Sequence, residues 1–205
     1  MTEEEWANAT NVFGLIDKLK VLLGESRSGR RKTRLLACAA LRHYWQHWWV
    51  TSPDVRELGI ADIAERHADG LITESALRFA QKLGVCAPVT WVYDLDPWRA
   101  AAGAISCAIQ VPGSDLDHLS GLRLLRDIFR NPFRPVAFDP DWRTSTAVAL
   151  AQQMYDTRDF AAMPILADAL QDAGCESPDI LDHCRDPRGV HVRGCFVVDL
   201  ILEKT

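Results

Sequence analysis

The sequence has no apolar stretch long enough to cross a bilayer and no segment that resembles a secretory signal. Its most apolar stretches, 35–41 and 100–111, are far shorter than the roughly 20 residues that a transmembrane helix needs. Residues 1–6 (MTEEEW) are acidic where a signal peptide is basic. We therefore expect a cytoplasmic protein with no membrane partner, whose six cysteines are reduced thiols.

Positive charge and catalytic motifs are also scarce. The formal net charge of −5 argues against a general affinity for nucleic acid, because a polyanion binder normally carries excess positive charge. No G-x-S-x-G, P-loop or G-x-G-x-x-G motif is present. No enzyme class is indicated, and no cofactor is expected unless the zinc considered below is bound.

Long alternation of apolar and polar residues, which is typical of strands, is rare as well. Apolar residues instead recur at three- and four-residue spacing, which predicts an all-α fold with little strand. A chain of 205 residues with 48% hydrophobic residues can bury a substantial core. We interpret 1–205 as a single-domain multi-helix bundle, with a subdivision at the break near 112–115 as the alternative and a C-terminal half that resembles a helical repeat.

Capping residues, glycines and prolines delimit the expected helices. They predict helices at 12–23, 33–49, 97–108 and 145–155, and further ones elsewhere along the chain. Three segments are not expected to form helices: 25–32, 86–95 and 131–140. Residues 25–32 (ESRSGRRK) are expected to form a loop, and the β-favouring composition of 86–95 an extended connector or one edge strand.

Residues 131–140 contain three prolines and should form an ordered, extended bridge. Phe133, Val136 and Phe138 are too apolar to lie in water, so we expect them to be largely buried. If Phe138 is largely buried, Phe138→Ala should lower the free energy of unfolding by about 3 kcal/mol or more.

Several segments carry a family resemblance. LRLLRDIFRNPFRPVAFDPDW, ALAQQMYDTRDFAAMPILADALQDAGC and DILDHCRDPRGVHVRGCFVVDLIL follow one another from Leu122, and the chain opens with MTEEEW and later RLLACAALRHYW. Together they resemble a large uncharacterised family that is expanded in planctomycete bacteria. The resemblance implies a natural bacterial cytoplasmic protein, without an established activity or catalytic residues. Ala39-Ala40-Leu41 is poorer in cysteine than the family pattern, which weakens any metal site built on Cys38.

A cluster of cysteine and histidine lies in the last fifth of the chain. Its members are Cys175, His183, Cys184, His191 and Cys195. Nine residues of helix would separate the backbones of Cys175 and Cys184 by about 13 Å, too far for two thiolates on one zinc ion. The remaining candidate ligands are Cys184, His191 and Cys195, together with His183. Alternatively, the cysteines are small buried residues and His191 satisfies a backbone carbonyl; we expect this alternative, since the spacing matches no closed zinc motif.

A predicted long helix contains a second concentration of aromatic and imidazole side chains. His43 and His47 are spaced i, i+4, which could place two imidazoles on a metal or haem, but packing at a helix contact is the simpler interpretation. The neighbouring Trp45, Trp48 and Trp49 form a candidate surface for a protein partner of unknown identity, because tryptophan is favoured at interface hot spots. Core packing explains them nearly as well.

One local basic run precedes that helix. It consists of Arg27, Arg30, Arg31, Lys32 and Arg34. The run could contact phosphates beside the tryptophans, but a solvated loop and first helical turn explain it more simply. The leading hypothesis is therefore a protein-interaction or scaffold module without its own catalysis. Zinc binding or a metalloenzyme centred on the C-terminal cluster is the first alternative, and a nucleic-acid-associated accessory factor is the second.

Overall fold

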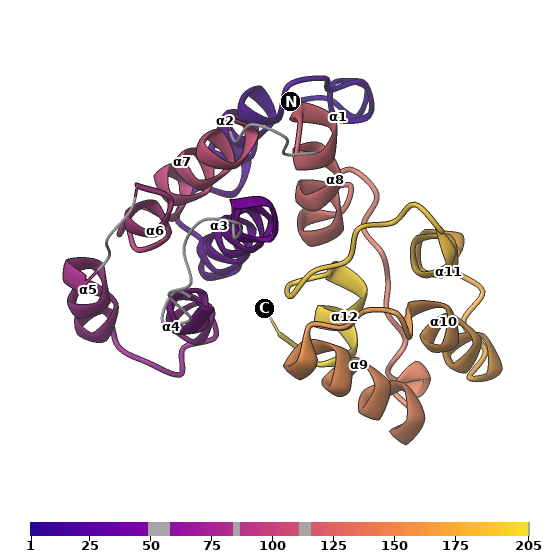
Figure 1. Cartoon of the computed structure of the whole chain (residues 1–205). Helices are drawn as coiled ribbons and strands as arrows, with labels where there is room; N and C mark the ends of the chain where they lie inside the picture. Colours follow the sequence, from indigo (N-terminus) through magenta and orange to yellow (C-terminus); the bar gives the residue numbers. More distant parts are fainter. Residues whose placement is uncertain (49–57, 84–86, 111–115, 205) are drawn as a thin grey trace. The chain divides into compact units, whose positions relative to one another are not determined.

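The computed structural model describes residues 1–48, 58–83, 87–110 and 116–204, and over these ranges it contains helices and irregular segments but no strand. The prediction of an all-α protein is confirmed (Figure 1). The helices are α1 (Glu3–Ala7), α2 (Val12–Leu23), α3 (Arg27–Trp48), α4 (Leu58–Ala68), α5 (Glu74–Leu83), α6 (Ala87–Val92), α7 (Pro97–Ile109), α8 (His118–Phe129), η2 (Pro140–Trp142), α9 (Ser145–Thr157), α10 (Met163–Asp172), α11 (Pro178–Arg185) and α12 (Phe196–Ile201).

The chain divides into two compact units, Met1–Leu125 and Arg126–Thr205. The boundary between the units falls inside α8. Residues 112–115, where the sequence suggested a subdivision, lie outside the described residues. That the whole chain forms one folding domain stays a prediction. Each unit is described by itself below.

Most helices begin where capping signals in the sequence predict them. At α1, Thr2 Oγ1 accepts the N–H of Glu5 while the Glu5 carboxylate accepts the N–H of Thr2, which is a complete capping box. Asp96 caps α7 and Thr144 caps α9 through side-chain oxygens. The helix predicted at 12–23 is confirmed with the same bounds.

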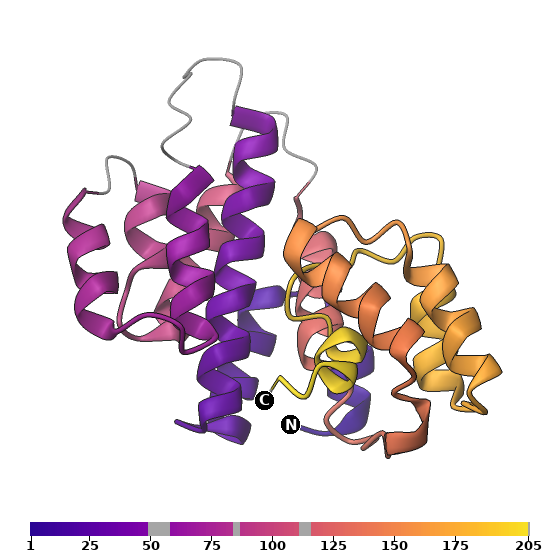
Figure 2. The same cartoon turned by 90° about the horizontal axis from the view of Figure 1, so that it is seen from below.

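In the N-terminal unit, α3 is the central helix. It packs against α4, α6 and α7, as Figures 1 and 2 show. Its apolar stretch 35–41 is entirely buried, which explains why this part of the helix carries no charge. In unit 1 the burial of α3 thus organises the helices around it.

The start of α3 differs from the predicted loop at 25–32. The helix already begins at Arg27, because Ser26 acts as its cap: Ser26 Oγ accepts the N–H of Gly29 and the Ser26 carbonyl accepts the N–H of Arg30. The polar composition therefore belongs to the first helical turns. The polar composition of 25–32 favours a loop, but the Ser26 cap and the burial of α3 stabilise helical structure from Arg27 onward.

The expected connector or edge strand at 86–95 is also wrong over most of its length, because Ala87–Val92 is helix α6. Pro88 stands in the first turn, where proline is compatible with a helix. α6 packs against α7, and the side chain of Arg34 donates hydrogen bonds to the carbonyls of Val92 and Leu95. These tertiary contacts override the β-favouring composition.

Charged side chains fix how α4 lies on α3. Arg31 Nε is 3.0 Å from Asp69 Oδ1, and both side chains are buried. Arg42 Nε is 2.9 Å from Glu65 Oε1, and its Nη2 is 2.6 Å from Asp62 Oδ1. A buried ion pair adds little net stability, but separating it leaves an uncompensated charge, so the buried Arg31–Asp69 pair and the buried Glu65 carboxylate disfavour any other register of the two helices.

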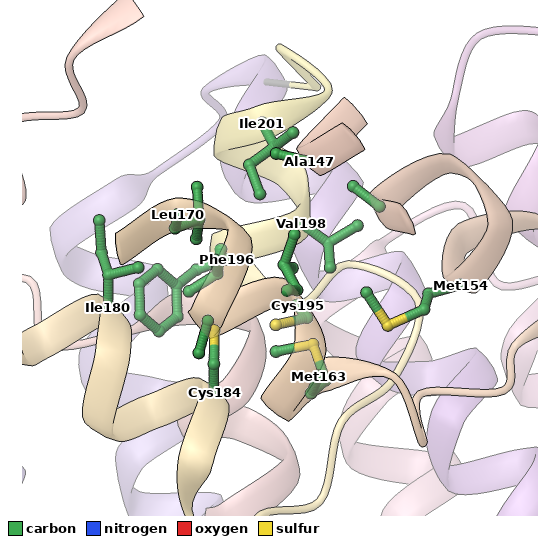
Figure 3. Close-up of a cluster of buried hydrophobic side chains, with 14 of the residues drawn as sticks. Ala147, Met154, Met163, Leu170, Ile180, Cys184, Cys195, Phe196, Val198 and Ile201 are labelled. Atoms are coloured by element: carbon green, nitrogen blue, oxygen red, sulfur yellow. The ribbon is translucent and has the colours of Figure 1, made fainter. Parts of the chain in front are cut away.

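The C-terminal unit has its own apolar core, formed mainly by α9, α10, α11 and α12 (Figure 3). Its largest buried side chains come from all four helices and include Met154, Tyr155, Leu166, Leu170, Ile180, Phe196, Val197 and Ile201. Tyr155 also lies beneath the cations of Arg193 and Lys204, 4.2 and 4.5 Å from its ring centroid. The C-terminal end of the chain is therefore held against α9.

The segment predicted as an extended proline bridge forms a turn over 132–134, where the N–H of Arg134 donates to the Asn131 carbonyl, and is irregular only over 135–139; its apolar residues are half-buried. Val136 and Phe138 pack on the core of the C-terminal unit, and Phe138 meets Trp142 edge to face at 5.5 Å. Phe133 is likewise half-buried. The prediction that Phe133, Val136 and Phe138 are largely buried is therefore corrected. Part of each of the three side chains remains exposed to water.

Two further expectations concern membranes and thiols. Among the described residues, no helix combines the length and apolar character of a bilayer-spanning segment. Cys38, Cys107, Cys175, Cys184 and Cys195 are free thiols.

The half-burial of Phe138 lowers the expected effect of its removal. Phe138→Ala should destabilise the protein by about 1–2 kcal/mol instead of the 3 kcal/mol or more of a fully buried phenylalanine, because only part of the ring leaves water on folding. Urea unfolding followed by circular dichroism measures the difference. A loss above about 3 kcal/mol would mean that the ring is fully buried.

The contact between α6 and α7 gives a second test. A Cβ atom on Gly103 of α7 would lie 2.2 Å from Cδ2 of Trp91 on α6. Gly103→Ala should therefore destabilise the protein by at least about 1–3 kcal/mol. The matched control is Gly14→Ala in α2, where a Cβ meets nothing within 4 Å and the substitution should be neutral or stabilising by up to about 1 kcal/mol. Equal effects in urea unfolding would contradict the packing of α6.

Candidate metal centre

Four side chains of the C-terminal unit direct one potential ligand atom each towards a common point. They are Asp127, His183, His191 and Cys195, and their four ligand atoms all lie within 4.8 Å of one another. Asp127 Oδ1 is 3.1 Å from His183 Nε2 and 2.9 Å from His191 Nδ1. Cys195 Sγ is 3.3 Å from His183 Nε2 and 4.0 Å from His191 Nδ1.

The four residues come from separate elements. Asp127 lies in the last turn of α8, His183 in α11, His191 in the loop that follows α11, and Cys195 at the N-cap of α12. Gly194 adopts a φ of 99°, which non-glycine residues rarely take, and this turn brings Cys195 to the start of α12. The site therefore exists only when the C-terminal unit is folded.

The centre is largely closed to solvent. The exposed fraction of the side chain is 2% for Asp127, 7% for His191 and 21% for His183, and Cys195 as a residue is 0% exposed. Phe196 packs against the His183 ring at 4.4 Å between centroids. These contacts hold the imidazole in place and restrict access to the thiol.

Asp127 is the centre of this arrangement. Burial by itself would raise the pKa of its carboxyl group, but hydrogen bonds with His183 and His191 outweigh burial and hold the pKa below its ordinary value. The backbone N–H of Val192 donates to Oδ2 at 3.0 Å. Oδ2 is thereby occupied, and Oδ1 is the oxygen that faces the two rings and the thiol.

The two nearby cysteines differ in surroundings. Burial, and next the negative charge of Asp127, raise the pKa of the Cys195 thiol well above its ordinary value. Burial likewise raises the pKa of Cys184 to about 12. Cys184 lies among the apolar side chains of the core (Figure 3) and is not one of the four converging residues. Cys184 was predicted as a ligand, but its position on α11 turns it into the core, whereas its neighbour His183 lies among the four converging residues.

The arrangement is not that of a Cys-His-Asp catalytic triad. In a triad, the nucleophile and the carboxylate face opposite nitrogens of the ring, so that the carboxylate orients the base. Here Asp127 and Cys195 both face Nε2 of His183, and both face Nδ1 of His191. A protonated, buried thiol is also a poor nucleophile. The donor atoms converge on a point instead of forming a relay.

Distances between the donors fit a tetrahedral ion. With zinc bonds of about 2.0–2.1 Å to nitrogen and oxygen and about 2.3 Å to sulfur, two N/O ligands lie about 3.3 Å apart and a nitrogen and a sulfur about 3.6 Å apart. The observed separations of 2.9 and 3.1 Å, and of 3.3 and 4.0 Å, differ from these by a few tenths of an ångström.

The sequence identified three of the four converging residues and missed Asp127. Asp127 is separated by 56 positions from the next member, so spacing could not connect them. A weak signal was present: Asp127 stands between the buried Leu124, Leu125 and Ile128, on a helix face where a carboxylate needs a partner.

The other predicted site residues are not part of this centre. His43 is half-buried in α3, whereas the side chains of Trp45, His47 and Trp48 and the whole of Trp49 lie outside the described residues. The interaction surface predicted there stays a prediction.

The basic run is not a continuous solvent-exposed patch. Arg31 and Arg34 are buried and engaged with Asp69 and with carbonyl groups, respectively. Arg30 is exposed and pairs with Glu25 at 2.7 Å. Because two of the five cations face the interior of unit 1, the geometry does not favour the nucleic-acid hypothesis.

Comparisons with protein-family models, with curated proteins and with solved structures yield no match for this chain. The assignment of a site therefore rests on its own residues. The resemblance to a planctomycete-expanded family stays a prediction.

Removal of the central carboxylate tests the geometry independently of any metal. Asp127→Ala should destabilise the protein by about 3 kcal/mol or more, because it leaves the nearly buried His191, the partly buried His183 and the Val192 N–H without their acceptor. Asp182→Ala, at an exposed position next to His183 on α11, is the matched control and should change stability by less than about 0.5 kcal/mol. Equal effects of the two substitutions in urea unfolding would contradict the central role of Asp127.

Proposed function

We propose that the C-terminal unit is a zinc-binding module, in which Asp127, His183, His191 and Cys195 hold one structural Zn²⁺. The observation that carries this proposal is the convergence of four donor atoms from four segments on one buried point. Cysteine sulfur and histidine nitrogen are preferred zinc ligands, and a carboxylate oxygen completes a set of four.

Charge balance supports a divalent ion. A thiolate at Cys195 and the carboxylate of Asp127 carry two negative charges, and the two imidazoles are neutral when they act as ligands. A divalent cation therefore makes the site neutral, which matters because an uncompensated charge is costly at a buried position. The softer sulfur and nitrogen donors favour Zn²⁺ over Mg²⁺ or Ca²⁺, which prefer oxygen.

A cluster held only by hydrogen bonds accounts less well for the geometry. Without a metal, both imidazoles would direct an N–H at the single oxygen Oδ1, and the thiol of Cys195 would compete with them for it. The other oxygen of Asp127 already accepts the N–H of Val192. One cation bound to all four donor atoms would remove the competition of the two N–H groups and the thiol for Oδ1.

The closed character of the site favours a structural over a catalytic role. Catalytic zinc sites keep one position for water or substrate, whereas structural sites use four protein ligands. Here four side chains are available and three of them are almost completely buried. The ion would connect α8, α11, the following loop and α12, so its binding free energy would contribute directly to folding.

Metal analysis tests the proposal. Protein purified without a histidine tag should contain one zinc per chain by inductively coupled plasma mass spectrometry. Chelation should lower the melting temperature markedly, because structural zinc contributes on the order of 10 kcal/mol of apparent binding free energy. This outcome differs from the expectation from sequence, in which the cysteines are only small buried residues.

Two cysteine variants make the test specific. Cys195→Ser should lose the zinc, whereas Cys184→Ser should keep it and show only the effect of an ordinary buried substitution. Zinc well below one per chain in the unsubstituted protein, with a melting temperature that chelators leave unchanged, would overturn the proposal. Equal loss of zinc in both variants would contradict the ligand assignment.

A further inference from the structure

The loop between α11 and α12 is closed by local hydrogen bonds before it reaches the proposed ligand His191. Asp186 Oδ1 accepts the N–H of Arg188 at 2.9 Å, and the Asp186 carbonyl accepts the N–H of Gly189 at 2.9 Å. This turn determines where residues 189–192 leave the end of α11. It is exposed to solvent at Arg188, so its shape comes from these bonds and not from burial in the core.

Gly189 lies in this turn directly against the His191 ring. A Cβ atom built on Gly189 would be 2.8 Å from His191 Nε2 and 3.3 Å from Cε1. It would also be 3.0 Å from the Asp186 carbonyl oxygen. Gly189 is not among the glycines with positive φ, so the position needs glycine for space and not for backbone conformation.

The same loop also orients the carboxylate. Three residues after Gly189, the N–H of Val192 donates to Asp127 Oδ2 at 3.0 Å, while His191 Nδ1 lies 2.9 Å from Oδ1. The turn thus places one nitrogen of His191 against Gly189 and directs the other nitrogen into the site. Because the imidazole ring is rigid, a shift of the ring at Nε2 also changes where Nδ1 lies relative to Asp127 and Cys195.

We propose that Gly189 is a positioning residue of the metal centre: the missing side chain leaves the space that lets His191 present Nδ1 to the ion. This inference rests on the proposed zinc site. Gly189 touches no ligand atom itself and acts only through the ring of His191. Groups that orient metal ligands in this way typically change metal affinity by roughly 10–100-fold when they are altered.

The test compares Gly189→Ala with Arg188→Ala in the full chain. Arg188→Ala changes the same turn at a side chain that points into solvent and keeps the backbone N–H bonded to Asp186, so it is the matched control. Zinc affinity is measured by competition with a chromophoric chelator, and the coordination by the visible absorption of the Co²⁺-substituted protein. Gly189→Ala should weaken zinc binding by roughly 10–100-fold and alter the Co²⁺ spectrum, whereas Arg188→Ala should change neither.

The outcomes separate the two proposals. An unsubstituted protein that binds no zinc would overturn the metal site and this inference together. Tight zinc binding that Gly189→Ala leaves unchanged would overturn the inference alone. Weaker binding with an unaltered Co²⁺ spectrum would also overturn it, because the substitution would then act on the loop and not through the coordination of His191.

A second variant covers the case in which Gly189→Ala does not fold. In the His191→Ala background the ring that the new methyl group meets is absent, so Gly189→Ala added to that background should leave the variant folded and change its urea midpoint little. A double variant that fails to fold, or whose midpoint falls far below that of His191→Ala, would place the conflict at the Asp186 carbonyl and overturn the role in positioning His191.

Discussion

The C-terminal unit depends on the buried carboxylate of Asp127. A carboxylate removed from water requires hydrogen-bond donors or a cation, and in this unit the donors come from more than one segment. Here α11 contributes His183, and the following loop contributes His191 and the N–H of Val192. The last turn of α8, α11 and the chain leading into α12 are therefore held together by one side chain. The apolar core formed by α9 to α12 provides most of the buried area, whereas Asp127 determines how the polar segments close over it.

In the N-terminal unit, ion pairs compensate the charged side chains that lie in the interior. Charged residues of α3 stand directly before and after the buried apolar stretch 35–41, so Arg31 and Arg34 are buried and Arg42 is partly buried. Asp69 pairs with Arg31, Glu65 pairs with Arg42, and the carbonyls of Val92 and Leu95 accept hydrogen bonds from Arg34. The basic run is consequently a packing feature of α3 over part of its length. The same side chains that suggested a phosphate-contacting surface serve to fix the neighbouring helices.

A metal ion at Asp127 would change how the C-terminal unit is stabilised. Without it, the unit relies on the core and on hydrogen bonds that converge on one oxygen. With it, two anionic and two neutral ligands form a neutral centre, and the affinity for the ion becomes part of the folding free energy. The loop containing Gly189 then has a role beyond connecting two helices, because its shape decides whether His191 can take part. The proposed function and the positioning of His191 thus follow from the same buried carboxylate.

The sequence by itself determined the helical class and most helix boundaries, because capping residues, prolines and glycines act within a few residues of where they stand. Thr2, Asp96 and Thr144 begin the helices that they predict. Only the tertiary structure decided the start of α3 and the helicity of α6, where burial and contacts with distant helices override local composition. It also decided the site: His183, His191 and Cys195 stand out in the sequence, but Asp127 lies 56 residues before them and is joined to them only by the fold. Cys184, one residue from His183, points into the core for the same reason, since neighbouring positions on a helix face different directions.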